Sequence, residues 1–144
     1  MLKQIATNNF YEILVDSEQN LLFLELRGFW GSRTNVPEYL NDCKKAATYL
    51  QPGFNALVDL TKTKTISEDA VALHQEVQKF FGGYGLNKAA EIHRDDPIVQ
   101  YQFSHLARST GVNKQIQKFT DRNAAMAWLI QSDTKTGFFD SLRG

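Results

Sequence analysis

Ala56-Leu57-Val58-Asp59-Leu60-Thr61 is the stretch of this chain that decides its fold. An apolar run stops at Asp59, a loop of lysines and threonines follows, and Ser67 then opens a helix with Glu68 and Asp69 in its first turn. In open α/β sheets, the end of a strand that leads into a helix N-terminus is the usual place for ligands or regulatory groups. No catalytic or cofactor motif occupies this stretch, so the sequence predicts where a site lies more clearly than what it does.

Apolar runs around this stretch predict five strands. We expect them at Phe10 to Asp16, Leu21 to Arg27, Phe54 to Leu60, Lys88 to His93 and Gln115 to Phe119. Four turn-forming residues join the first two strands into an antiparallel hairpin, and helices separate the others. Because parallel strands need crossover connections, the order predicts an α/β fold with a single mixed sheet that is mainly parallel after the hairpin.

Apolar residues at helical spacing, together with capping residues, predict four helices. The first is expected to run from a cap at Asn35 to Pro52-Gly53, the second from Ser67 to Gly82-Gly83, the third from Asp95 or Asp96 to Gly111, and the fourth from Thr120 or Asp121. Strands and helices together predict one domain over residues 1–132. Residues 133–144, which include Phe138 and Phe139, are expected to form a C-terminal tail.

The composition narrows the classes of partner and compartment. Sixteen basic and sixteen acidic residues give formal neutrality, which removes the electric field that attracts nucleic acid or anionic membranes. Cys43 is the only cysteine, which excludes an intrachain disulfide and fits a reducing compartment. The N-terminus lacks the apolar core of a signal peptide, and no apolar run reaches the length of a membrane span. We therefore expect a soluble cytoplasmic protein with no nucleic-acid partner and no transmembrane segment.

Titratable side chains offer few candidates for chemistry. Asp59 is expected to accept hydrogen bonds from the following loop, and Ser67 is expected to cap its helix. His93 ends a strand beside carboxylates, where an imidazole can bind a ligand, act as a base or pair with those carboxylates. The spacing of histidines and cysteine matches no metal motif. We assign no metal, cofactor or catalytic residue, and an acid/base pair of Asp59 and His93 is the least favoured hypothesis.

Aromatic residues outside the predicted strands are candidates for a contact surface. Phe29 and Trp30 follow the hairpin, and Phe81 and Tyr84 close the second predicted helix. If these rings are exposed together, they form a patch for a partner protein, a second copy of the chain or an acyl chain. If they are buried, they only seal the core.

The closing module resembles a known family. Phe119-Thr120-Asp121 followed by Ala124-Ala125-Met126-Ala127-Trp128-Leu129 is similar to the F-x-D-x-x-x-A-x-x-W-L ending of bacterial SpoIIAA-like proteins. These belong to a STAS-like group related to anti-sigma-factor antagonists and to CRAL-TRIO lipid carriers. The resemblance implies a SpoIIAA/STAS-like fold and a non-enzymatic binding or regulatory domain that acts by protein contact, including contact with a second copy in a homodimer. A carrier or sensor of a small apolar ligand is the alternative.

One departure from the family concerns its phosphorylation site. Anti-sigma-factor antagonists carry the phosphorylated serine in a D-S-S-G sequence, and this chain has Ser67-Glu68-Asp69-Ala70 there. Aligned from Asp59, Ser67 falls on the family's Asp, and the two acidic residues fall on its serines. The resemblance therefore implies a fixed negative charge at this helix N-terminus in place of a phosphoserine switch.

Overall fold

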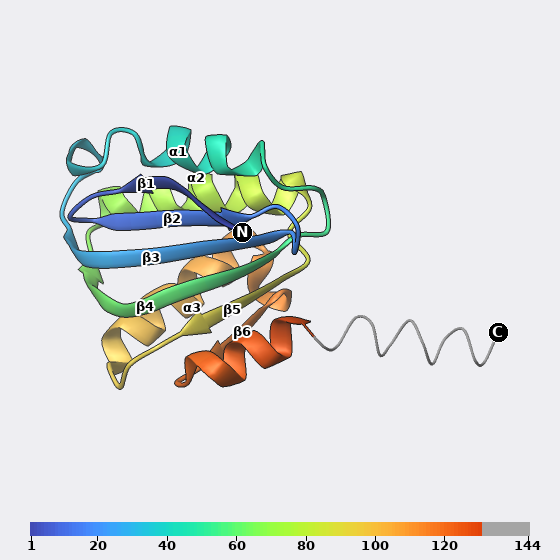
Figure 1. Ribbon diagram of the computed structural model, residues 1–144. Helices are drawn as coiled ribbons and strands as arrows, with labels where there is room; N and C mark the ends of the chain where they lie inside the picture. Colours follow the sequence, from blue (N-terminus) through green and yellow to red (C-terminus); the bar gives the residue numbers. More distant parts are fainter. Residues whose placement is uncertain (131–144) are drawn as a thin grey trace.

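The computed structural model describes residues 1–130, which form one mixed sheet of six strands with helices on both faces (Figure 1). The strands are β1 (Leu2–Thr7), β2 (Tyr11–Asp16), β3 (Leu21–Trp30), β4 (Asn55–Ile66), β5 (Lys88–Ile92) and β6 (Ile116–Phe119). They lie side by side in chain order. The pairs β1–β2 and β2–β3 are antiparallel, and all later pairs are parallel. The predicted mixed α/β sheet is therefore confirmed.

Four α-helices and two short 3-10 helices are found in the described part of the chain. They are η1 (Arg33–Asn35), α1 (Tyr39–Ala47), α2 (Glu68–Tyr84), α3 (Pro97–Thr110), η2 (Val112–Lys114) and an unlabelled helix over residues 122–130. None of these is long and apolar enough to cross a membrane. The predicted domain limit at residue 132 and the predicted tail with Phe138 and Phe139 lie outside the described residues.

The predicted number of strands was wrong, because β1 was not recognised. β1 is an edge strand that pairs only with β2, and most of its residues are exposed. The pairing register also shifts between Gln4 and Ala6. A bulge of this kind interrupts the alternation of inward and outward side chains that identifies a strand in a sequence.

The predicted end of the central strand was also wrong. β4 continues past Leu60 to Ile66, and its second half pairs with β3, with Lys62 opposite Arg27 and Ile66 opposite Trp30. The threonines and lysines expected to form a loop are therefore part of the strand. β5 ends opposite Asp59, so β4 and β3 extend beyond the rest of the parallel sheet. Asp59 lies within a strand and not at its end.

The two faces of the sheet are covered to different extents. α1, α2 and α3 pack on one face, where most buried apolar side chains form the main core. On the other face the 122–130 helix packs over the last three strands. That smaller core consists of Leu57, Ala90, Ile92, Ala125 and Leu129. Among the described residues, no helix covers this second face at β1, β2 and β3.

Most of the predicted helix caps are confirmed. Ser67 caps α2 and Asp96 caps α3, with each side chain accepting a hydrogen bond from a backbone N–H of the first turn. Gly111 ends α3 in the left-handed conformation, as expected. The predicted start of the first helix was wrong: Ser32 caps the separate turn η1, and α1 begins only at Tyr39.

The predicted end of the second helix was wrong as well. α2 runs through Gly82 and Gly83 and ends at Tyr84, before Gly85. Gly85 has a φ of +118°, and a Cβ atom there would lie 2.9 Å from the Cα of Pro52. Both the backbone conformation and the close approach require glycine at this position. Two glycines within a helix cost only about 1 kcal/mol each, so they do not stop it.

Candidate functional site

The N-terminus of α2 is tied to the segment that follows β3. The hydroxyl of Ser67 accepts a hydrogen bond from the N–H of Ala70 at 3.2 Å and donates one to the carbonyl of Gly31 at 2.8 Å. The carboxylate of Asp69 accepts a hydrogen bond from the N–H of Arg33 at 2.6 Å. The Ser67 hydroxyl is thus engaged as a cap, and a permanent negative charge is held beside it, where the helix dipole favours it.

A surface groove opens next to this junction, between η1 and α1 on one side and α2 on the other. Its volume is about 400 Å³, and its apolar part consists of Val36, Pro37, Leu40 and Leu73. Pro37 is exposed and Leu40 is half-buried. Arg33 and Glu76 also line the groove, and their side chains form an ion pair. The groove therefore has an apolar floor and a charged rim.

The four candidate aromatic residues do not form a common surface. Phe29 is 53% exposed, whereas Trp30 and Phe81 are buried. The indole N–H of Trp30 donates to backbone carbonyls of β3 and of the segment before β2. Tyr84 is half-buried, and its hydroxyl donates to the carbonyl of Leu50 at 2.7 Å. Of the four, Phe29 alone is exposed, and the other three rings pack in or against the main core.

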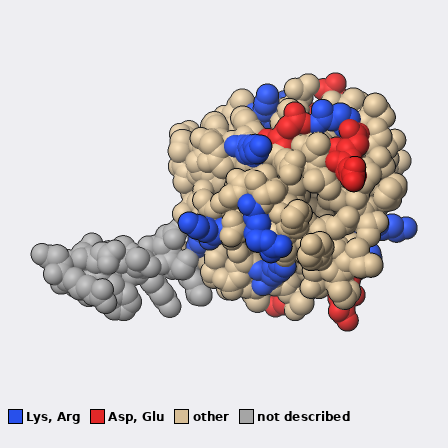
Figure 2. Space-filling model, turned by 180° about the vertical axis from the view of Figure 1, so that it is seen from behind, with Lys and Arg blue, Asp and Glu red and all other residues tan. Residues whose placement is uncertain are grey.

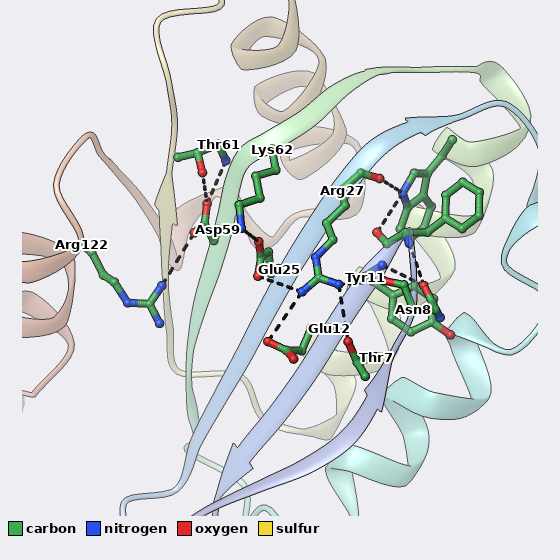
Figure 3. A network of polar contacts seen from close by, with 12 residues as sticks. Thr7, Asn8, Tyr11, Glu12, Glu25, Arg27, Asp59, Thr61, Lys62 and Arg122 are labelled. Carbon is green, nitrogen blue, oxygen red and sulfur yellow. Dashed lines mark hydrogen bonds and ion pairs between the residues drawn. The ribbon is translucent and has the colours of Figure 1, made fainter.

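Asp59 has the hydrogen-bond partners that the sequence predicted. Its carboxylate accepts from the N–H and the hydroxyl of Thr61, at 2.9 and 2.7 Å. The guanidinium of Arg122, from the 122–130 helix, lies 3.7 Å from the other carboxylate oxygen (Figure 3). These contacts satisfy a half-buried carboxylate, so Asp59 fastens the helix to the sheet.

A separate chain of ion pairs lies beside Asp59 and crosses the uncovered face of the sheet (Figure 3). Glu25 lies between Lys62 at 2.7 Å and Arg27 at 3.3 Å, and Arg27 also reaches Glu12 at 3.8 Å. Burial alone would raise the pKa of Glu25, but the hydrogen bonds from Lys62 and Arg27 outweigh it and lower that pKa. Acidic and basic groups alternate along this chain, so the uncovered face has little net charge to attract a charged ligand.

His93 and Asp59 lie on opposite faces of the sheet, so they cannot act as an acid/base pair. Asp59 pairs in register with Ile92, and successive strand residues point to opposite faces. His93 instead contacts Glu91: its Nε2 lies 2.9 Å from the Glu91 carboxylate, and both side chains are buried. Glu91 was not recognised in the sequence, although its spacing of two residues from His93 in a predicted strand was a usable signal.

The main core contains a cavity of about 70 Å³ between the sheet and helices α2 and α3. Apolar side chains line most of it, and His74, Gln78 and Glu91 add polar atoms. Burial lowers the pKa of His74 to about 4, so its imidazole is neutral at pH 7. Sites for drug-sized or lipid-like ligands occupy about 300–1,000 Å³. The cavity is too small for the apolar ligand that the alternative hypothesis requires.

Other polar residues offer little chemistry in the described part of the chain. No three His, Cys, Asp or Glu side chains there lie close enough together to hold a metal ion. Cys43 is buried in α1, and burial raises the pKa of its thiol well above the usual range. It packs in the core and is not an activated nucleophile.

Comparison with known proteins identifies the fold. No family model matches the sequence, and the search of curated proteins found no match. The structure is similar to the crystal structure of an uncharacterized protein of the DUF3478 family with a SpoIIAA-like fold, from Shewanella loihica PV-4. The TM-score is 0.64, and the match covers 86% of this chain and 97% of that protein at 17% identity. The chain has a SpoIIAA-like fold, as its closing motif implied, and at this identity the likeness extends to the fold alone.

Proposed function

We propose that this SpoIIAA-like domain is a non-enzymatic, cytoplasmic binding domain that acts by contact with a protein partner. The groove between η1, α1 and α2 carries the proposal, because it combines apolar side chains with a charged rim. Protein interfaces have this anatomy, with apolar contacts at the centre and polar groups around them.

Two neighbouring features favour a protein as the occupant of this groove. Phe29, the last residue but one of β3, has its exposed ring beside Gly31, two residues before η1, and offers a partner further apolar area. The first turn of α2 adds the exposed carboxylates of Glu68 and Asp69. A partner segment with an apolar side chain flanked by basic groups would complement this surface. The formal neutrality of the chain also permits a second copy as the partner.

Figure 2 shows the side of the molecule formed by α2 and α3. Acidic and basic side chains lie close together in its upper part, a small group of basic side chains lies lower down, and most of the surface is uncharged. A surface of this kind suits short-range contacts with a folded protein better than long-range attraction to a polyanion.

Site-specific photo-crosslinking tests the proposal. p-Benzoylphenylalanine replaces Pro37 in the groove, and in a control it replaces Ser17, which is exposed in the turn between β2 and β3. After irradiation in cells, we expect one discrete adduct from the Pro37 variant and none from the Ser17 variant. The mass of the adduct distinguishes a second copy of the chain from another protein.

A pair of charge substitutions provides the second half of the test. The substitution Pro37→Asp adds charge at an exposed position and is expected to reduce complex formation at least tenfold, whereas Ser17→Asp leaves it unchanged. Circular dichroism verifies that both variants are folded. Equal adducts at both positions, or no adduct at either, would contradict a protein partner in this groove.

A further inference from the structure

The connections that leave the carboxyl ends of β5 and β6 go to opposite faces of the sheet. α3 follows β5 and packs on the same face as α1 and α2, through Val99 and Phe103. The 122–130 helix follows β6 and packs on the other face, through Ala125 and Leu129. Figure 1 shows the two helices on either side of the sheet at this end. Where neighbouring connections diverge in this way, an open α/β sheet forms a crevice at the carboxyl ends of its strands.

The structure has a groove of about 370 Å³ at this place. His93 and Lys118 line it from the ends of the two strands, and Thr120 and Ala124 line it from the start of the 122–130 helix. The ring of Phe119 also lies in the lining. The volume falls in the range of about 300–1,000 Å³ that small-molecule sites occupy. The groove is separate from the one between η1, α1 and α2, and it shares no lining residue with it.

A buried carboxylate orients the histidine in this groove. The side chains of Glu91 and His93 are only 5% and 3% exposed, and the Glu91 carboxylate accepts the hydrogen bond from His93 Nε2 at 2.9 Å. This bond fixes the imidazole ring, as carboxylate–histidine pairs do in binding and catalytic sites. No hydrogen bond from the described residues engages the other nitrogen, Nδ1. His93 lines the groove, so its Nδ1 is left to interact with a molecule bound there.

The other groups around the groove indicate the chemistry of that molecule. The ammonium of Lys118 binds the hydroxyl of Ser104 and retains further N–H donors. The carboxylate of Asp121 accepts from the N–H groups of Asn123 and Ala124, so its charge is committed to the helix cap. The groove therefore presents a lysine ammonium that retains N–H donors and an oriented imidazole beside a phenyl ring.

We propose that this groove binds a small organic carboxylate. The ligand's carboxylate accepts hydrogen bonds from Lys118 and from Nδ1–H of His93, and its hydrocarbon part packs against Phe119 and Ala124. His93 then lies between the ligand carboxylate and that of Glu91. An imidazole that donates to two carboxylates carries a proton on each nitrogen, so both ring nitrogens of His93 are protonated in the complex.

Benzoate is the probe that tests this inference, with the full-length ¹⁵N-labelled chain as the receptor. We expect benzoate to shift the His93 ring resonances saturably at constant ionic strength, with both ring nitrogens protonated in the complex. Acetate, which lacks a ring to stack on Phe119, is expected to bind more weakly, and inorganic phosphate weakest of all.

Variants locate the binding to this groove. Lys118→Gln is expected to weaken benzoate binding at least tenfold, whereas Lys114→Gln removes the same charge from η2 outside the groove and leaves binding unchanged. Ala124→Leu fills the groove from an exposed helix position and is expected to abolish binding without unfolding the chain. An unchanged His93 spectrum up to about 20 mM benzoate, which means binding weaker than about 2.3 kcal/mol, would overturn the proposal. Equal losses in the two lysine variants, or tighter binding of phosphate than of benzoate, would overturn it too.

Discussion

His74 makes the stability of the fold depend on pH, and this dependence can be worked out from the structure. The imidazole is buried between the rings of Trp30, Tyr39 and Phe103, stacked on that of Trp30 at 4.7 Å. Its Nε2 has no hydrogen-bond partner in the described part of the chain. Of the described residues that line the core cavity with His74, Glu91 is the acidic one, and it is already paired with His93. No contact in the described part of the chain therefore compensates a positive charge on His74.

The sign of the effect follows from the pKa values of the two states. Burial lowers the pKa of His74 from 6.5 to about 4 in the folded protein. Between these values the unfolded chain binds a proton that the folded chain does not, so the free energy of unfolding rises with pH. The contribution of His74 is complete above pH 6.5 and is lost as the pH falls toward 4. Between pH 7 and pH 5 the expected loss is about 2 kcal/mol.

Urea denaturation at pH 7 and pH 5 measures this loss. The variant His74→Phe keeps an aromatic ring and removes the titrating group. In this variant we expect most of the difference of about 2 kcal/mol between pH 7 and pH 5 to disappear. His105→Gln is the control, because His105 is exposed on α3 and stacks only on Tyr101. The carboxylates of Asp16 and Glu25 also have lowered pKa values, but their contributions are lost only at more acidic pH. A wild-type pH dependence in His74→Phe would refute this reasoning.

Two further predictions concern backbone features. Ser67→Ala removes the acceptor for the N–H of Ala70 and is expected to lower the free energy of unfolding by about 1 kcal/mol, whereas Ser67→Thr retains most of it; equilibrium unfolding measures both. Gly85→Ala is expected to lower the melting temperature by several degrees, since the new Cβ would meet Pro52 and φ is +118°. Gly83→Ala, at a helical position with nothing within 4 Å, is expected to raise it; a similar loss in both glycine variants would contradict this account.

The sequence predicted the sheet and its helices where local signals agree with the tertiary structure. Caps such as Ser67 and Asp96 lie beside the backbone groups that they satisfy, so they can be recognised without knowledge of the fold. The continuous apolar run of the central strand indicated burial on both faces, and β4 places Ala56 in the main core and Leu57 in the smaller one. These features depend on neighbours only a few residues away.

The errors arose where distant pairing decides the structure. Thr61 to Thr65 read as a polar loop, yet Thr63 and Ile66 face the core while Lys62 and Lys64 face solvent. Only the long β3 strand opposite them makes this segment a strand. The candidate site moved as a result, because Asp59 was expected at a strand end and lies within β4. No local signal in β4 reveals how far its partner extends.

The composition of β5 explains why the groove lined by His93 lies at the ends of β5 and β6, one strand further along the sheet than the end of β4, where the sequence placed the site. Each connection from β3 to β6 returns to a parallel neighbour on the same side of the sheet, and right-handed crossovers then place α1, α2 and α3 on one face. All five residues of β5 are buried, including Ala90 and Ile92 on the opposite face. Those side chains need a cover, and the next helix in the chain, at residues 122–130, supplies it. Apolar burial at β5 thus forces the chain to change faces after β6, and the change opens the groove in which Glu91 orients His93.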